Sequence, residues 1–113
     1  MVFRNFFSKP TIAEITPEET RTKQKAGAVI VDVREPSEWR EGHIPGAVHI
    51  PLGSLSGRLH ELDPSQEIVT VCRSGHRSMT AAQVMQRAGF SRVSNMAGGM
   101  ISWMRQRFPV SKQ

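Results

Sequence analysis

The chain has 113 residues, a formal net charge of +5 and one cysteine. This length suits a single domain with one core, and one cysteine excludes an internal disulfide and suits a reducing compartment, which we take to be the cytoplasm. The basic residues are scattered, aromatic residues are few, and no apolar run is long enough to span a membrane, so we expect neither nucleic acid nor a membrane as a partner. The charge instead suggests small anionic ligands or acidic partners.

We expect an N-terminal extension at residues 1–10, a domain at 11–108 and a C-terminal tail at 109–113. The tail should fray, because its short polar sequence offers little to pack. Within the domain, weak alternation of polar and apolar residues at 11–15 predicts a short edge strand.

A surface helix is predicted next, because Thr16, Pro17 and Glu19 form a typical helix start, with Thr16 and Glu19 as a capping box. The helix should end near Ala26, with Gly27 as its C-terminal cap. It has almost no apolar face, so we expect it to lie on the surface.

An apolar run at residues 28–33 predicts a buried parallel strand beside Ile68–Val71. Asp32 and Arg34 put charge at the carboxyl end of this strand, where open α/β sheets bind ligands. We expect the two residues to support the site as a structural ion pair rather than to act in catalysis.

The elements before the cysteine are short. Residues 37–41 predict a helix with Trp39 buried against the sheet, and residues 47–50 predict a strand after a turn within which His43 forms a hydrogen bond. A leucine repeat then predicts a helix that Asp63-Pro64 ends. The repeat consists of Leu52, Leu55, Leu59 and Leu62.

The only cysteine, Cys72, follows the predicted strand Ile68–Val71 and precedes a helical pattern that begins at Ser78. The loop between them can turn several backbone amides toward one point, where the helix end adds partial positive charge. This setting predicts a low-pKa thiolate that acts as a nucleophile in an anion cradle. A small buried core residue is the commonest role of a lone cysteine, but a core cysteine would not need so polar a loop.

Hydrogen bonds should provide most of the stabilisation of that thiolate. A hydrogen bond to a charged group contributes about 1.5–3 kcal/mol, whereas a helix dipole contributes about 0.3–1 kcal/mol. We therefore expect the loop amides to dominate, with Arg73 and Arg77 assisting.

The helix after the cysteine should end at Gly89, with Phe90 folding back on Met85. Residues 92–96 predict a further strand, and Gly98-Gly99 a tight turn into a last helix. The predicted apolar face of that helix consists of Ile101, Met104 and Phe108. Because strands alternate with helices, we predict an α/β fold with a central, mostly parallel sheet and helices on both faces.

Short motifs along nearly the whole chain point to one family. The motifs are Ile15-Thr16-Pro17-Glu18-Glu19, Val31-Asp32-Val33-Arg34-Glu35, Glu38-Trp39, Gly42-His43-Ile44-Pro45-Gly46-Ala47, Cys72-Arg73-Ser74-Gly75-His76-Arg77-Ser78 and Met96-Ala97-Gly98-Gly99-Met100-Ile101-Ser102-Trp103. In this order they strongly resemble the rhodanese family of sulfurtransferases, in its single-domain form. The resemblance implies the three-layer rhodanese-like fold and a Cys72 that carries sulfur as a persulfide, with thiosulfate as the usual test donor.

The implied reaction has two steps and needs no metal or organic cofactor. The Cys72 thiolate attacks the outer sulfur of thiosulfate, sulfite leaves, and a thiophilic acceptor then takes the sulfur. The acceptor is cyanide in a test tube, or a thiol or dithiol in a cell, including a thioredoxin-like or sulfur-carrier protein. The residues expected to bind the donor are Arg73, Ser74, Gly75, His76, Arg77 and Ser78. The arginines should orient the anion, the serines should donate hydroxyl hydrogen bonds, and the glycine should allow the tight loop.

Two other functions remain open. Loops with cysteine and arginine also bind tetrahedral oxyanions in phosphatases and arsenate reductases, although the related phosphatases have a loop one residue longer. Some relatives of this fold are non-catalytic binding modules, but these usually lose the cysteine that this chain keeps. We expect no metal centre, because His43, His49, His60 and His76 lack metal-ligand spacing.

Overall fold

The structure is a computed structural model that describes residues 11–113, and the extension predicted at residues 1–10 lies outside the described residues. Five strands form one sheet in the order β1-β5-β4-β2-β3, and every neighbouring pair is parallel. The strands are β1 (Ala13–Ile15), β2 (Val29–Asp32), β3 (Val48–His49), β4 (Ile68–Val71) and β5 (Val93–Met96). The predicted parallel sheet is confirmed, with the strand before the cysteine, β4, at its centre.

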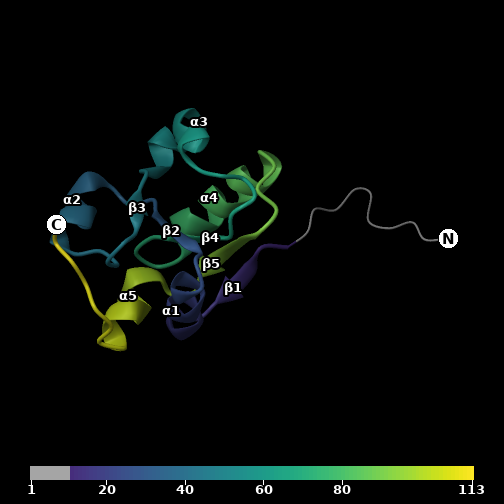
Figure 1. Cartoon of the computed structure of the whole chain (residues 1–113). Coiled ribbons are helices and arrows are strands. Elements are labelled where there is room, and N and C mark those ends of the chain that lie inside the picture. Colours follow the sequence, from purple (N-terminus) through teal and green to yellow (C-terminus); the bar gives the residue numbers. More distant parts are fainter. Residues whose placement is uncertain (1–10) are drawn as a thin grey trace.

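Helices cover both faces of this sheet, which confirms the three-layer α/β fold. The helices are α1 (Pro17–Lys25), α2 (Pro36–Glu41), α3 (Leu55–Arg58), α4 (His76–Arg87) and α5 (Gly99–Arg105). Helices α3 and α4 lie on one side of the sheet and α1 and α5 on the other (Figure 1). Side chains of neighbouring residues in β4 point to opposite faces of the sheet. Ile68 packs in the core cluster with Met85 of α4, whereas Val69 packs in the cluster with Trp103 of α5.

The helix ends follow the sequence signals closely. Thr16 and Glu19 form the predicted capping box, with hydrogen bonds of 3.0 Å and 2.8 Å. At the end of α4, the amide of Phe90 donates to the carbonyl of Met85 at 3.0 Å, and Gly89 has a positive φ of 103°. This is the predicted Schellman end, in which a glycine takes up the left-handed conformation without a Cβ penalty.

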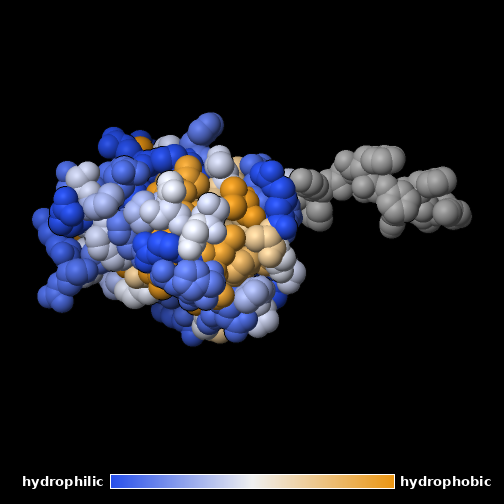
Figure 2. All heavy atoms as spheres, turned by 90° about the horizontal axis from the view of Figure 1, so that it is seen from above, coloured by the Kyte–Doolittle hydropathy of each residue, from blue (hydrophilic) through white to orange (hydrophobic). Residues whose placement is uncertain are grey.

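The leucine repeat forms no continuous helix, so that prediction is wrong. It divides into a 3-10 turn at Leu52–Ser54, the short α3, and a second 3-10 turn at Leu59–Glu61. Gly53 and Gly57 weaken helix propensity in this stretch, while its leucines still reach the core because Leu55 is buried and the others are partly buried. Seen from above, hydrophobic residues gather near the middle of this face of the molecule, and hydrophilic residues surround them (Figure 2).

The prediction of which residues form the apolar face of the last helix is also wrong. Met100 and Trp103 of α5 are buried, at 3% and 1% exposure, whereas Ile101 and Met104 are exposed. The rotation of α5 is fixed at its start, because the amides of Met100 and Ile101 donate to the carbonyls that follow β4. Phe108 still packs at the edge of this core, with its ring against Trp103.

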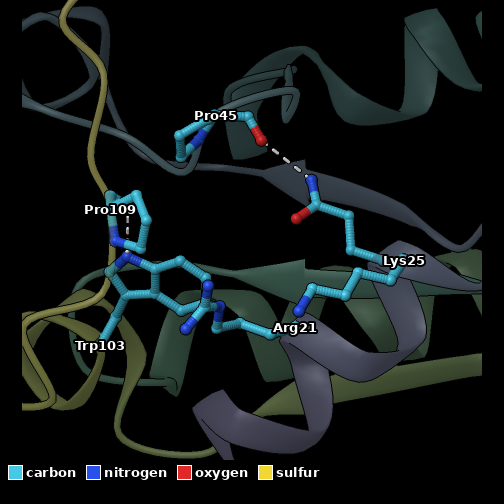
Figure 3. Close-up of a pocket in the computed structure, with 6 residues that line it drawn as sticks. Arg21, Lys25, Pro45, Trp103 and Pro109 are labelled. Atoms are coloured by element: carbon cyan, nitrogen blue, oxygen red, sulfur yellow. Dashed lines mark hydrogen bonds between the residues drawn. The ribbon is translucent and has the colours of Figure 1, made fainter.

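The C-terminal tail is docked against the domain, so the prediction that it frays is wrong. Ser111 and His43 exchange two backbone hydrogen bonds of 2.8 Å and 2.9 Å. The indole of Trp103 donates to the carbonyl of Pro109 at 2.9 Å (Figure 3). The side-chain amide of Gln24, on α1, donates to the carbonyl of Pro45, which connects the turn after α2 to α1. No helix among residues 11–113 has the length and apolar character needed to cross a membrane.

Candidate active site

Cys72 lies directly after β4, at the carboxyl edge of the sheet, and its side chain is 1% exposed. The loop that follows is short, because α4 begins at His76 rather than at Ser78 as predicted. Gly75 makes this possible, since its φ of 102° lies in the left-handed region that glycine adopts without strain. The chain therefore turns sharply and brings the first turn of α4 over the cysteine sulfur.

Two donors contact the sulfur of Cys72 directly. The amide of Gly75 lies 3.1 Å from Sγ, and the hydroxyl of Ser78 lies 3.2 Å from it. Burial raises the pKa of the Cys72 thiol, but hydrogen bonds from the hydroxyl and amide of Ser78, and from the amides of Gly75 and Ser74, outweigh it and lower the pKa. One of the predicted loop amides and one of the predicted serine hydroxyls therefore lie within hydrogen-bond distance of the sulfur.

The two loop arginines differ in their surroundings. Arg73 is exposed and Arg77 is half-buried. Arg77 forms a two-armed ion pair with Glu38 of α2, with N···O distances of 2.7 Å and 2.8 Å. Glu38 raises the pKa of Arg77 most, and the negative charge of Cys72 adds to this effect. Because such attraction is mutual, Arg77 helps the thiolate, but as a minor contributor whose charge Glu38 already balances.

Glu38 is a site residue that the sequence analysis did not single out. The hydrogen bond from Arg77 lowers the pKa of the Glu38 carboxyl to about 2, and the amide of Glu35 helps by donating to the same carboxylate at 3.0 Å. Only the Glu38-Trp39 motif drew attention to this position, and nothing in the sequence paired Glu38 with an arginine 39 residues away.

Two buried polar residues under the loop were also missed. The side-chain amide of Asn95, on β5, donates to the carbonyl of Gly75 at 3.0 Å. The hydroxyl of Thr70, on β4, lies 2.9 Å from the carbonyl of Ser78 and 3.2 Å from the side-chain oxygen of Asn95. Both side chains are fully buried, so this network fixes the backbone of the loop from below.

The start of α5 closes the loop from the side. The amides of Met100 and Ile101 donate to the carbonyls of Cys72 and Arg73, at 2.9 Å and 3.1 Å. Gly99 lies against the same two carbonyl oxygens, and a Cβ at this position would overlap both. The predicted Gly98-Gly99 turn therefore also brings the start of α5 into close contact with the cysteine loop.

Asp32 and Arg34 lie buried at the end of β2 and bind each other. Arg34 Nη2 lies 2.8 Å from Asp32 Oδ2 and 2.8 Å from the carbonyl of Gly42. The pair therefore holds the end of α2 to the sheet, and neither side chain forms a hydrogen bond with Cys72. This position fits the structural role that we expected.

The remaining candidates lie at the rim or away from the sulfur. His76 and Ser74 are exposed, and Ser74 contributes its amide rather than its hydroxyl. Trp39 is half-buried instead of buried against the sheet, because it stacks on His43 with ring centroids 3.5 Å apart. His43 bonds to the carbonyl of Trp39 at 2.8 Å rather than within its own turn. No cluster of three or more possible metal ligands occurs within residues 11–113.

Comparison with known proteins gives a consistent family. The model of the family described as "Rhodanese-like domain" matches residues 16–106. The thiosulfate sulfurtransferase GlpE of Stutzerimonas stutzeri is 37% identical over 95 residues, which cover 84% of this chain and 86% of that protein.

YrkF of Bacillus subtilis, named as a candidate sulfur carrier protein, is 49% identical over 74 residues, but the match covers 66% of this chain and 40% of that longer protein. Among solved structures, the rhodanese-related protein of Thermoplasma volcanium superposes with a TM-score of 0.83 at 27% identity, covering 89% of this chain and 99% of that one.

Proposed function

Because this chain belongs to the rhodanese-like domain family, whose matching members include sulfurtransferases, we propose that it moves sulfane sulfur from thiosulfate, or from a persulfide donor, to a thiophilic acceptor through a persulfide on Cys72. One observation carries the proposal. The only cysteine of the chain lies in a short loop with its Sγ held by an inward-facing amide at 3.1 Å and a hydroxyl at 3.2 Å.

The first step is a displacement at sulfur. The thiolate of Cys72 attacks the outer sulfur of thiosulfate and forms a new S–S bond, while the original S–S bond breaks and sulfite leaves with its electron pair. The product on the protein is a persulfide anion, whose outer sulfur carries the charge. The amides of Ser74, Gly75 and Ser78 act on Sγ of the thiolate, and we expect them to stabilise the charge that develops on the adjacent outer sulfur, because preorganised donors have their largest effect where charge develops.

The second step returns the protein to its starting state. Cyanide attacks the outer sulfur and leaves as thiocyanate, or an acceptor thiolate attacks it and becomes a persulfide. In both cases the S–S bond to Cys72 breaks and its electron pair restores the thiolate. Since the nucleophile, the leaving group and the acceptor account for every electron, the reaction needs no metal or organic cofactor. A thiol that must remain reduced suits the cytoplasm, where we place the reaction.

Among the described residues, the donor meets one loop arginine without an ion-pair partner rather than two. Arg77 is paired with Glu38, so the exposed Arg73 is the loop cation left to attract an anionic donor. His76 lies at the rim beside it and contributes no contact to the sulfur. We therefore assign orientation of the donor to the loop amides and Arg73, and positioning of the loop to Arg77.

The test compares sulfur and phosphate chemistry on one preparation of protein. The segment from Cys72 to Arg77 has six residues, which we expect to leave room for one atom beyond the sulfur, whereas a phosphate needs donors for three equatorial oxygens and a wider ring. We expect thiosulfate:cyanide sulfurtransferase activity and negligible hydrolysis of an aryl phosphate. Efficient phosphate ester hydrolysis without thiosulfate use would establish the phosphatase alternative instead.

A further inference from the structure

We propose that α5 presents a docking surface for an acceptor protein, namely an acidic protein that carries its thiol beside an apolar surface. This inference rests on the proposed function, because sulfur must leave Cys72 for an acceptor. The surface, called the α5 patch below, consists of Ile101, Met104 and Arg105 of α5 together with Arg73 of the cysteine loop.

The α5 patch adjoins the cysteine loop through the backbone. The amide of Ile101 donates to the carbonyl of Arg73 at 3.1 Å, and the preceding amide, of Met100, donates to the carbonyl of Cys72 at 2.9 Å. Met104 and Arg105 follow Ile101 at the i+3 and i+4 positions, so they share its face of the helix. The patch therefore extends outward from the edge of the loop.

The apolar part of the patch is unusual for this molecule. Among residues 11–113, the exposed large hydrophobic side chains are Ile101, Met104 and Val110, at 37%, 58% and 42% exposure. Two of these three lie one helical turn apart beside the reactive loop. The opposite face of α5 is well packed, with Trp103 at 1% exposure, so a poorly docked helix does not explain them. Methionine also suits adaptable binding surfaces, because its side chain is flexible and polarizable.

The polar part of the patch is positive. Arg73 and Arg105 are exposed, and within residues 11–113 the ion pairs of the structure involve other cations, such as Arg77 and Arg92. The whole chain carries a net charge of +5. An acidic partner would therefore be attracted to this rim and oriented on it, and salt would weaken that attraction.

The depth of the sulfur explains why a protein acceptor needs such a surface. Cys72 is 1% exposed, and its outer sulfur would lie among the loop amides. Cyanide or a small thiol can enter without touching α5, but a protein thiol cannot reach this depth unless the surface around it contacts the rim. We expect a transient contact of the smallest interface class, below about 1,200 Å² in total.

The experiment follows sulfur from the loaded protein to three acceptors: cyanide, dithiothreitol and reduced thioredoxin, which serves as the acidic protein dithiol. The test variant is Met104→Glu. Its control is Ser91→Glu, which makes the same charge change at an exposed position before β5, at the opposite end of the strands from Cys72. Wild type should transfer to thioredoxin faster than to dithiothreitol at equal dithiol concentration, and the thioredoxin rate should fall with added salt.

Met104→Glu should slow transfer to thioredoxin about tenfold or more, as loss of a central apolar contact does, and should leave the cyanide and dithiothreitol rates unchanged. Ser91→Glu should match wild type with all three acceptors. Equal thioredoxin rates in the two variants, or no advantage of thioredoxin over dithiothreitol in wild type, would overturn the proposal. A wild-type dimer that dissociates in Met104→Glu would also overturn the proposal, because the patch would then bind a second copy of this chain rather than an acceptor protein. Failure of the proposed function would show separately, as the absence of thiocyanate from wild type.

Discussion

The guanidinium of Arg77 and the carboxylate of Glu38 face each other with two contacts of 2.7 Å and 2.8 Å, which join the first turn of α4 to α2. This pairing gives Arg77 a different task from the one its place in the loop suggests. A fork of parallel hydrogen bonds fixes geometry as well as charge. Arg77 therefore anchors the loop to a neighbouring helix, and its charge is largely balanced before any anionic donor arrives.

The Glu38–Arg77 pair should make stability depend on acidity. The pKa of Glu38 falls from 4.5 to about 2 on folding, so the pair contributes fully above pH 4.5 and is lost as pH falls toward 2. Because both side chains are partly exposed, we expect a contribution of about 0.2–1 kcal/mol. Urea unfolding of wild type and Glu38→Gln should differ at pH 7 and converge near pH 2. Glu41→Gln changes an exposed residue on the same helix. Any difference in unfolding free energy between this variant and wild type should not shrink between pH 7 and pH 2.

Release of Arg77 should also change the use of thiosulfate. In Glu38→Gln the guanidinium loses its charged partner, and the mouth of the site becomes more positive. We expect KM for thiosulfate to decrease by a few-fold at low salt, since attraction of a dianion is electrostatic, and to return toward the wild-type value at high salt. Steady-state kinetics with Glu41→Gln as the matched charge control checks this. An increased KM in Glu38→Gln would mean that Arg77 must be held by Glu38 to bind the donor.

The hydroxyl of Ser78 should control the reactivity of Cys72. Removing it in Ser78→Ala takes away the strongest of the hydrogen bonds that lower the pKa of the thiol, so the midpoint of the alkylation rate against pH should rise. Sulfur transfer at pH 7 should fall about ten- to a hundredfold, the equivalent of one hydrogen bond to a charged group. Ser74→Ala is the control, because Ser74 is exposed and acts through its amide. Equal alkylation midpoints in Ser78→Ala and Ser74→Ala would contradict the role of the Ser78 hydroxyl as the side-chain donor to the sulfur.

The sequence analysis succeeded where signals are local. The capping box of Thr16 and Glu19, the Schellman end at Phe90, and the cysteine between a buried strand and a helix each depend on residues a few positions apart. The parallel sheet followed from the alternation of such elements. These patterns predicted where Cys72 and the loop amides beside it would lie, because strand, turn and helix are encoded within one short stretch.

The support of the site could not be predicted in the same way. Glu38 and Arg77 are 39 residues apart, and Asn95 reaches the carbonyl of Gly75 across 20 residues, so only the packed fold brings them together. The buried face of α5 was predicted wrongly for a related reason. Periodicity favoured Ile101 and Met104 as the buried face, but backbone hydrogen bonds to the cysteine loop turn Met100 and Trp103 inward instead.

The contact between α5 and the cysteine loop leads to a prediction about glycine. In Gly99→Ala the new Cβ would overlap the carbonyl oxygens of Cys72 and Arg73, so the loops must separate. We expect a loss of about 1–3 kcal/mol in unfolding free energy, as for other overpacked sites, together with slower sulfur transfer. Gly57→Ala is the matched control, because nothing lies within 4 Å of its Cβ position and its φ is ordinary. Chemical denaturation should show it as stable as wild type or more so.

The most direct test of the central claim is the intact mass of the protein after treatment with thiosulfate. Wild type should gain the mass of one sulfur atom, and cyanide should then remove that mass and release thiocyanate. Cys72→Ser should keep its thermal unfolding transition, because the change is small and local, and should gain no sulfur. If wild type gains no sulfur from thiosulfate or from a persulfide donor, or if Cys72→Ser gains it as readily, Cys72 is not the sulfur-carrying nucleophile.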